Sequence, residues 1–290
     1  MKKIICWWSG GITSAIACRV AIDIYGKENC RVIMLDTKNE HDDTYRFLTD
    51  CSIWYGLPIE ILSAIGDTYD NIEHTWLKHL SLNTANGAIC SYKLKRRVRE
   101  EWEKTNEYSH QVFGFEFNSH EQKRAMALSA NHPNAKPIYP LLMLGYDKAK
   151  CIDLIQKANI EPPEAYRLGF QNNNCLKTGC TQGGIGYWKK MQLEYPDKFL
   201  KMGTMEHRIT DLKGQPVTML KCQSKESKNK ARIKKYADLV FLIKNPSYPD
   251  HKCIDDMEGR PVEPLMECSG FCGTNDLNST NKTEKELAFI

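Results

Sequence analysis

Short apolar runs alternate with longer segments of helical spacing along the first 160 residues. Residues 4–8, 31–36 and 59–62 are apolar runs of the length typical of buried strands. Between these runs, apolar residues recur every three or four positions, as in residues 15–24 and 42–54, which predicts helices. Strands that alternate with helices predict an α/β fold with a parallel sheet.

The same alternation continues to residue 166 and then stops. We expect residues 1–166 to form one Rossmann-like, doubly wound domain with a mainly parallel five-stranded sheet, residues 167–274 to form a mainly helical, cysteine-containing C-terminal region, and residues 275–290 to form a polar tail. The further segments expected are strands at 110–115 and 137–142 and helices at 68–82, 97–104, 147–158, 185–194 and 196–207.

The turn Ser9-Gly10-Gly11 separates the first expected strand from the first helix. Strand, glycine turn and helix together bring free backbone N–H groups and the positive end of the helix dipole to one point, which favours an anion. The hydroxyls of Ser9, Thr13 and Ser14 add donors there. The turn lacks a Gly-Lys-Ser/Thr ending, so it is not the common loop of nucleoside triphosphatases.

Composition leaves the class of ligand open. The 290 residues are 41% hydrophobic and 26% charged, with a formal net charge of +4, which permits an anionic ligand but does not require nucleic acid. No apolar run approaches the roughly 20 residues of a membrane span. Trp7-Trp8-Ser9 interrupts the apolar start, so we interpret the chain as cytoplasmic rather than secreted.

Twelve cysteines in a reducing cytosol are not expected to form disulfides. Those within strand or helix patterns are interpreted as small buried hydrophobic residues, namely Cys6, Cys18, Cys30, Cys51 and Cys151. Seven lie near turns or polar stretches and need another explanation: Cys90, Cys175, Cys180, Cys222, Cys253, Cys268 and Cys272.

Several polar residues follow expected strands and would lie near the glycine turn, because ligands sit at the carboxyl ends of parallel strands. Asp36 and Thr37 follow the second strand, although Asp36 also suits a simple helix cap. Further along come Gly114 and the pair of Glu121 and Arg124, which also suits a surface ion pair. A basic run after Cys90, suited to phosphate but also to a solvated face, comprises Lys93, Lys95, Arg96, Arg97 and Arg99.

These segments resemble a known family. Ser-Gly-Gly-x-x-Ser at residues 9–14 resembles the PP-loop of the adenine nucleotide alpha-hydrolase-like superfamily, and residues 90–95, 114–124 and 139–166 resemble segments of its phosphoadenosine phosphosulfate (PAPS) reductase-like members. The resemblance covers residues 1 to about 190 in the family order. This chain has Thr13 where the PP-loop usually carries Asp, and Glu116 where the family carries Arg.

The resemblance implies an enzyme that binds an adenine nucleotide, PAPS or ATP, and acts in sulfur transfer or sulfate reduction. A reductase attacks the sulfate sulfur with a cysteine thiolate and needs a thiol reductant protein; an ATP-pyrophosphatase or adenylyltransferase of tRNA or DNA thiolation cleaves ATP, with Mg²⁺. Thr13 favours the reductase. The residues implied in nucleotide binding are Ser9, Gly10, Gly11, Thr13, Ser14, Asp36, Thr37, Lys95, Arg96, Gly114, Glu121 and Arg124.

Two cysteine pairs on glycine-bearing loops, Cys175 with Cys180 and Cys268 with Cys272, suggest one tetrahedral site for zinc or an iron–sulfur cluster. In the alternative, Cys268 is a redox nucleophile, and Cys90, beside basic residues, is a second catalytic candidate. The third interpretation is four unligated cysteines.

A function of another class is a nucleic-acid-binding or sensor module that binds the phosphate backbone through residues 221–235. The sequence does not fix the nucleotide, the sulfur acceptor or the oligomeric state, a homodimer being one option.

Overall fold

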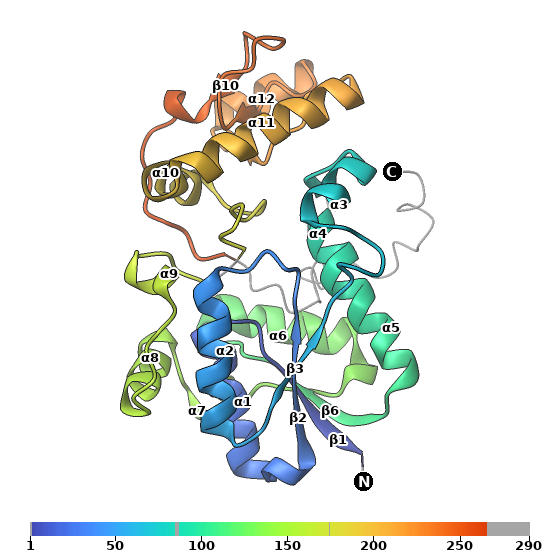
Figure 1. Ribbon diagram of the computed structural model, residues 1–290. Coiled ribbons are helices and arrows are strands. Elements are labelled where there is room, and N and C mark those ends of the chain that lie inside the picture. Colours follow the sequence, from blue (N-terminus) through green and yellow to red (C-terminus); the bar gives the residue numbers. More distant parts are fainter. Residues whose placement is uncertain (1, 85–86, 174, 266–290) are drawn as a thin grey trace.

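A computed structural model describes residues 2–84, 87–173 and 175–265. Its centre is a five-stranded sheet in the order β3-β2-β1-β6-β7, in which every strand pairs in parallel with its neighbours (Figure 1). This confirms the expected α/β class. The strands are β1 (Lys3–Trp7), β2 (Cys30–Leu35), β3 (Ile59–Leu62), β6 (Tyr108–Val112) and β7 (Pro137–Ile138).

Helices cover both faces of the sheet because successive strand residues point to opposite sides. Ile4 and Cys6 of β1 pack with α1 (Ile12–Tyr25), α2 (Asp42–Tyr55) and α8 (Lys148–Lys157). Their neighbours Ile5 and Trp7 pack on the other face with α5 (Arg97–Thr105) and α6 (Ser119–Asn131). The short helices α7 (Pro140–Leu144) and α9 (Glu164–Arg167) complete this part of the chain.

The order of strands reverses beside β1. The chain moves outward from β1 to β2 and β3, and then returns to place β6 on the other side of β1. In open parallel sheets the crevice at such a switch point, beyond the carboxyl ends of the strands, is where ligands bind. Here it lies between the ends of β1 and β6.

Ala165 and most buried apolar residues after it form a second hydrophobic core, which they share with residues 64–94. It includes the helices α10 (Ile185–Glu194) and α11 (Pro196–Lys213) and a three-stranded sheet in the order β10-β9-β8. Figure 1 shows these elements above the carboxyl ends of the large sheet. The other elements of this core region are α3 (Ile72–His79), the hairpin β4 (Asn83–Thr84) and β5 (Gly87–Ala88), α4 (Ile89–Ser91), the π-helix η2 (Tyr92–Arg96), β8 (Leu220–Lys221), α12 (Lys225–Ile233), β9 (Leu239–Phe241) and β10 (Lys252–Cys253).

Some element boundaries differ from the sequence-based expectation. The strand expected at 110–115 ends at Val112, and the strand expected at 137–142 ends at Ile138, since Pro140 begins helix α7 there. The helix expected at 68–82 is shorter and spans Ile72–His79, whereas the helix expected at 196–207 continues to Lys213.

Within the described ranges, no helix is both long and apolar enough to cross a membrane.

Candidate functional site

The glycine turn lies at the carboxyl end of β1, as the sequence predicts. Gly10 has a φ of +85°, in the left-handed region that favours glycine, and Gly11 is the N-cap of α1. The Ser14 hydroxyl accepts the Ser9 N–H at 3.0 Å and lies 3.0 Å from the Ser9 hydroxyl, so the turn closes on the first turn of the helix. The N-terminal N–H groups of α1 therefore face the switch point.

Two residues far along the chain hold this turn. The Asn173 side-chain amide donates to the Gly10 carbonyl and to the Thr44 hydroxyl, each at 2.9 Å. The Tyr166 hydroxyl accepts the Ile12 N–H at 3.2 Å. These hydrogen bonds fix the glycine turn from the side of α2 and α9.

Gly114 follows β6 and touches the start of α1. A Cβ atom on Gly114 would come within 2.5 Å of the Ser14 Cα and 2.7 Å of the Ser14 nitrogen. Both are backbone atoms that cannot move aside, so only glycine permits this approach. The segment after β6 and the start of α1 therefore lie backbone against backbone at the switch point.

Asp36 lies at the carboxyl end of β2 and is fully buried. Its carboxylate accepts the Lys38 N–H at 2.7 Å and the Tyr45 hydroxyl at 3.1 Å, and the Lys38 ammonium lies 3.3 Å away. Burial, with the charge of Asp36, raises the pKa of the Tyr45 phenol, so this hydroxyl stays a proton donor. The carboxylate is held by protein donors.

A buried ion pair lies beside Asp36. The Lys95 ammonium is 3.3 Å from the Glu40 carboxylate, and their side chains are 7% and 1% exposed. Glu40 also lies 3.3 Å from the Thr37 hydroxyl and 3.9 Å from the Cys175 sulfur. Lys95 belongs to the π-helix η2, a type of element frequent at functional sites. The structure thus places Thr37, Lys95 and Cys175 together near the end of β2.

The thiol of Cys175 is not a ready nucleophile in this environment. Burial and the Glu40 carboxylate raise its pKa well above the ordinary value, and the positive charge of Lys95 offsets this only in part. The charges of Cys180 and Cys90 also act on it, so these thiols lie within electrostatic reach of Cys175. The Cys90 sulfur is 3.7 Å from the hydroxyl of Thr181, which is the residue next to Cys180.

The predicted metal site is only half described. Cys268 and Cys272, and with Cys268 the first candidate nucleophile, lie outside the described residues. Among the residues that are described, no three His, Cys, Asp or Glu side chains are arranged to hold a metal ion. Cys175 and Cys180 would need thiols from elsewhere to complete a tetrahedral site.

Arg124 lies on α6, near the end of β6. Its guanidinium is 2.7 Å from both oxygens of Glu121 and stacks over the Phe115 ring at 4.6 Å. Arg124 is therefore next to the residue that follows Gly114, although Glu121 already pairs with it. Arg96, by contrast, pairs with Glu100 one turn further along, at 2.8 Å. Each arginine thus pairs with a glutamate close to it in the chain, and the nucleotide-binding role of both stays a prediction.

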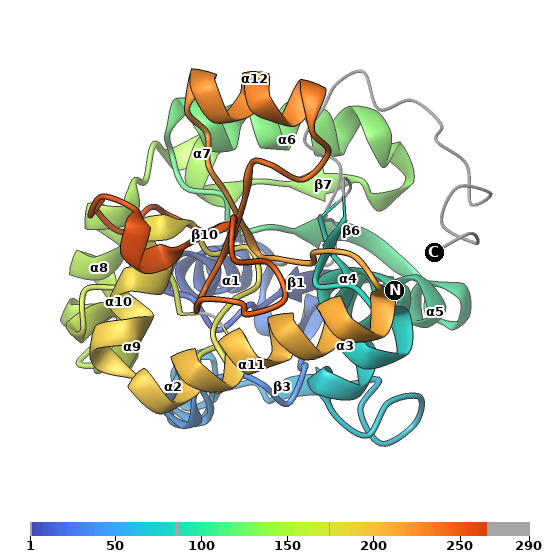
Figure 2. The ribbon, with the colours of Figure 1, turned by 90° about the horizontal axis from the view of Figure 1, so that it is seen from above.

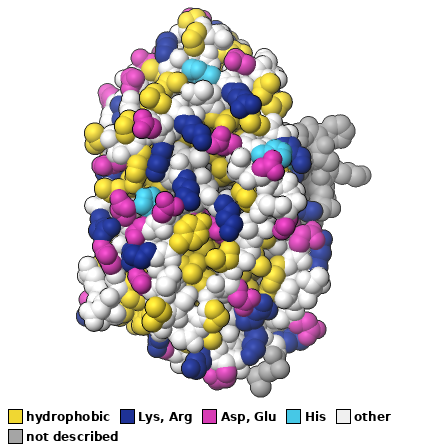
Figure 3. All heavy atoms as spheres, viewed as in Figure 1, with side chains coloured by type: hydrophobic (Ala, Val, Ile, Leu, Met, Phe, Trp, Pro, Cys, Tyr) yellow, Lys and Arg dark blue, Asp and Glu magenta, His cyan; other side chains and the backbone are white. Residues whose placement is uncertain are grey.

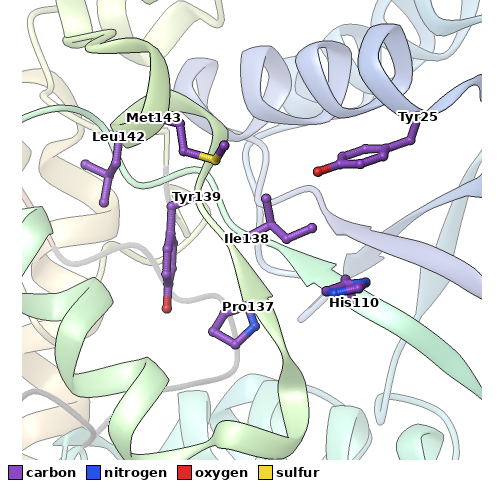
Figure 4. Close-up of a pocket in the computed structure, with 7 residues that line it drawn as sticks. All are labelled: Tyr25, His110, Pro137, Ile138, Tyr139, Leu142 and Met143. Atoms are coloured by element: carbon purple, nitrogen blue, oxygen red, sulfur yellow. The ribbon is translucent and has the colours of Figure 1, made fainter.

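A cavity of about 600 Å³ lies at the other end of α1, beside Tyr25 (Figure 4). It is mainly apolar and contains none of the predicted binding residues. Its other lining residues are His110, Pro137, Ile138, Tyr139, Leu142 and Met143. We assign the site to the switch point because the polar groups converge there, not at this cavity.

Sequence reasoning missed the role of Asn173. It belongs to the polar run at 171–173, which signals a loop but does not show which segment the loop contacts. The hydroxyl of Tyr166 ends a motif that the sequence analysis noted, yet its bond to Ile12 spans 154 positions. Only the fold brings such partners together.

No model of a known protein family matches this chain, and no curated protein sequence matches it. Among solved structures, the chain is similar to phosphoadenylyl-sulfate (PAPS) reductase from Candida auris, in a phosphate complex. The sequence identity is 17%, the match covers 60% of this chain and 81% of that chain, and the TM-score is 0.44. A similarity at this level does not establish a shared activity.

Proposed function

We propose that the chain is an enzyme that binds an adenine nucleotide at the switch point and acts in sulfur transfer or sulfate reduction. The observation that carries this proposal is the contact of Gly114 with Ser14, which brings the turn after β1 and the end of β6 to one point. The N-terminus of α1 faces that point, and helix N-termini bind phosphate and sulfate.

PAPS is the nucleotide that the neighbouring residues favour over ATP. Cleavage of ATP calls for Mg²⁺, which proteins bind through one or two carboxylates together with the substrate phosphates. The two buried acids near the turn are engaged, Asp36 by Lys38 and Tyr45 and Glu40 by Lys95. Thr13 also stands where ATP-cleaving relatives of the PP-loop family carry Asp. These residues as they stand do not suit a magnesium site.

In the reductase reaction, a cysteine thiolate attacks the sulfate sulfur of PAPS. A sulfur–sulfur bond forms, the bond from sulfur to the phosphate oxygen breaks, and adenosine 3′,5′-bisphosphate leaves with the electron pair. A second thiol then releases sulfite and forms a disulfide, which a thiol reductant protein reduces. Cys90 is one proposed thiol, and Cys268 is the other in the alternative in which it holds no metal; a positive charge such as Lys95 would favour the thiolate.

The metal site remains a separate proposal. Zinc or an iron–sulfur cluster would be held by Cys175 and Cys180 with Cys268 and Cys272, and would supply a structural cross-link or electron transfer. Metal analysis of anaerobically purified protein tests it, with about one zinc or one cluster expected per chain. Absence of both metals would shift the proposal to free thiols.

Calorimetric titration with PAPS, adenosine phosphosulfate and ATP tests the function. We expect saturable binding of PAPS, and sulfite release when a thiol reductant is added. Tighter binding of ATP, with pyrophosphate release, would favour the second candidate, an ATP-pyrophosphatase of tRNA or DNA thiolation. No binding of any of the three would contradict the proposal.

A further inference from the structure

The positive charge of the chain is concentrated in one segment. Residues 214–252 contain nine Lys or Arg and three Asp or Glu, a formal charge of +6, while the whole chain carries +4. The rest of the chain is therefore net negative. A basic stretch on an otherwise acidic protein creates a local positive potential.

Helix α12 presents most of this charge to solvent. Its one buried residue is Ser227, and all seven basic side chains between Lys221 and Lys235 are exposed. Lys225, Lys228 and Arg232 follow helical spacing and share one face of the helix. We call this set the α12 face.

The charges of the α12 face are not neutralised by the helix itself. Among the described residues, Lys230 is the only one of the seven basic residues with an ion pair, 2.7 Å from Glu226, and this pair lies away from the α12 face. Helix α5 and the residue before it show the opposite arrangement, because each arginine there has a glutamate partner on the same helix. These pairs are Arg96 with Glu100, Arg97 with Glu100 and Glu101, and Arg99 with Glu103.

The α12 face occupies a defined place on the molecule. The N–H of Cys222 donates to the Asp238 carbonyl at 2.7 Å, and the Ser224 hydroxyl caps the helix by accepting the Ser227 N–H. The small sheet thus fixes where α12 begins. Viewed from above, α12 lies at the margin of the molecule, on the side of α6 (Figure 2). The face shown in Figure 3 carries basic and acidic side chains interspersed.

We propose that the α12 face binds the phosphate backbone of nucleic acid without sequence preference. When Lys and Arg side chains neutralise phosphates, counterions leave the nucleic acid, and this release increases the affinity of the protein for it. Phosphate contacts of this kind position a protein but do not identify bases. A membrane-binding helix would carry a broad apolar face beside the basic one, whereas the exposed large apolar residue of α12 is Ile233 alone. The surface does not include the glycine turn, so the proposal is independent of nucleotide binding.

The test compares two variants that each lose three positive charges. One is Lys225→Gln/Lys228→Gln/Arg232→Gln. The control is Lys104→Gln/Lys150→Gln/Lys157→Gln, whose lysines are exposed but paired with acids on their own helices. Binding of a fluorescein-labelled RNA duplex, and of a DNA duplex of the same length, is measured by anisotropy over a range of salt concentrations. The same proteins are mixed with vesicles of phosphatidylserine and phosphatidylcholine.

We expect the parent and the control to bind at least one duplex, and the α12 variant to bind it about tenfold or more weakly. The slope of log affinity against log salt should fall in size by about 0.9 for each DNA phosphate that the variant no longer neutralises. Binding by the RNA only or the DNA only identifies the polymer. Equal weakening in both variants, absence of duplex binding by the parent, or binding to vesicles alone would overturn the proposal.

Discussion

Gly114 is the residue whose size matters most to the proposed site. It lies against the backbone of Ser14, so its missing side chain sets the distance between the end of β6 and the start of α1. The neighbouring Phe115 contacts Arg124 through its ring. A change at residue 114 would therefore act on the turn and on α6 together.

Gly114→Ala should weaken nucleotide binding and lower the free energy of unfolding by about 1–3 kcal/mol, because the added carbon overlaps fixed backbone atoms. Gly259→Ala is the matched control, since a Cβ atom there would have no neighbour within 4 Å. Urea unfolding and calorimetric titration measure the two effects. A Gly114→Ala protein with the parent's stability and affinity would show that the approach of the two backbones is not tight in solution.

Glu206 is an acidic residue buried in the second core. It is fully buried on α11, and its two carboxyl oxygens accept the N–H groups of Met219 and Leu242 at 2.7 Å. Burial raises its pKa to about 8, although the two N–H donors oppose the shift. The native protein therefore keeps this proton at pH values where the unfolded chain has lost it.

Since the native state binds the extra proton, stability should fall as the pH rises from about 5 to about 8. The contribution of Glu206 to this decline is at most about 1.4 kcal/mol per pH unit. Glu206→Gln cannot ionise and should show a flatter dependence, whereas Glu258→Gln, at an exposed position, should behave as the parent does. Urea unfolding at several pH values measures how the free energy of unfolding depends on pH. An identical dependence for all three proteins would refute the raised pKa of Glu206.

At the scale of elements, the pair of Lys95 and Glu40 joins the π-helix η2 to the segment that follows β2. Both side chains are buried, so each charge is stabilised by its oppositely charged partner. The sequence predicts that the basic run faces phosphate, and this lysine does lie near the ends of the strands, but with a protein carboxylate as its partner. A ligand phosphate at this point would bind Lys95 together with Glu40, or would take the place of Glu40 as the partner of Lys95.

Lys95→Met should lower the free energy of unfolding by about 3–5 kcal/mol, because Glu40 is left buried without its partner. The double variant Lys95→Met/Glu40→Leu should recover most of this stability, since neither charge of the pair remains. Denaturant unfolding of the four proteins forms a double-mutant cycle. If the two single changes simply add in the double variant, the pair is not coupled.

The local sequence pattern predicts most helices and strands. It does not always predict which face of a helix is buried or where an element ends. The strand at 59–62 and the helix at 185–194 have the predicted bounds, because each has a clear apolar run or period between turn residues. The helical period of residues 42–54 predicts that Tyr45 and Trp54 face inward. In α2 these two side chains are only half-buried, while Phe47 and Tyr55 are buried, since the buried face of a helix depends on the elements packed against it.

At the scale of the whole molecule, the sequence predicts the position of the turn but not its partners. Asn173 and Tyr166 reach the turn from more than 150 positions away, and residues 64–94 share a core with the C-terminal region. Such contacts leave no period in the sequence because they arise from the path of the chain in space. The two cysteine pairs remain a prediction, since one pair lies outside the described residues.

The central claim is that the turn after β1 holds the anionic group of an adenine nucleotide. Gly11 has a φ of −91° and a ψ of 156°, a backbone conformation that a branched residue also adopts. Gly11→Val should therefore fold, while its side chain blocks the approach of phosphate or sulfate to the N–H groups. Calorimetric titration of PAPS and ATP into the parent and the folded Gly11→Val variant tests this most directly. We predict saturable binding of PAPS to the parent and none to the variant; equal affinity in both would contradict the claim.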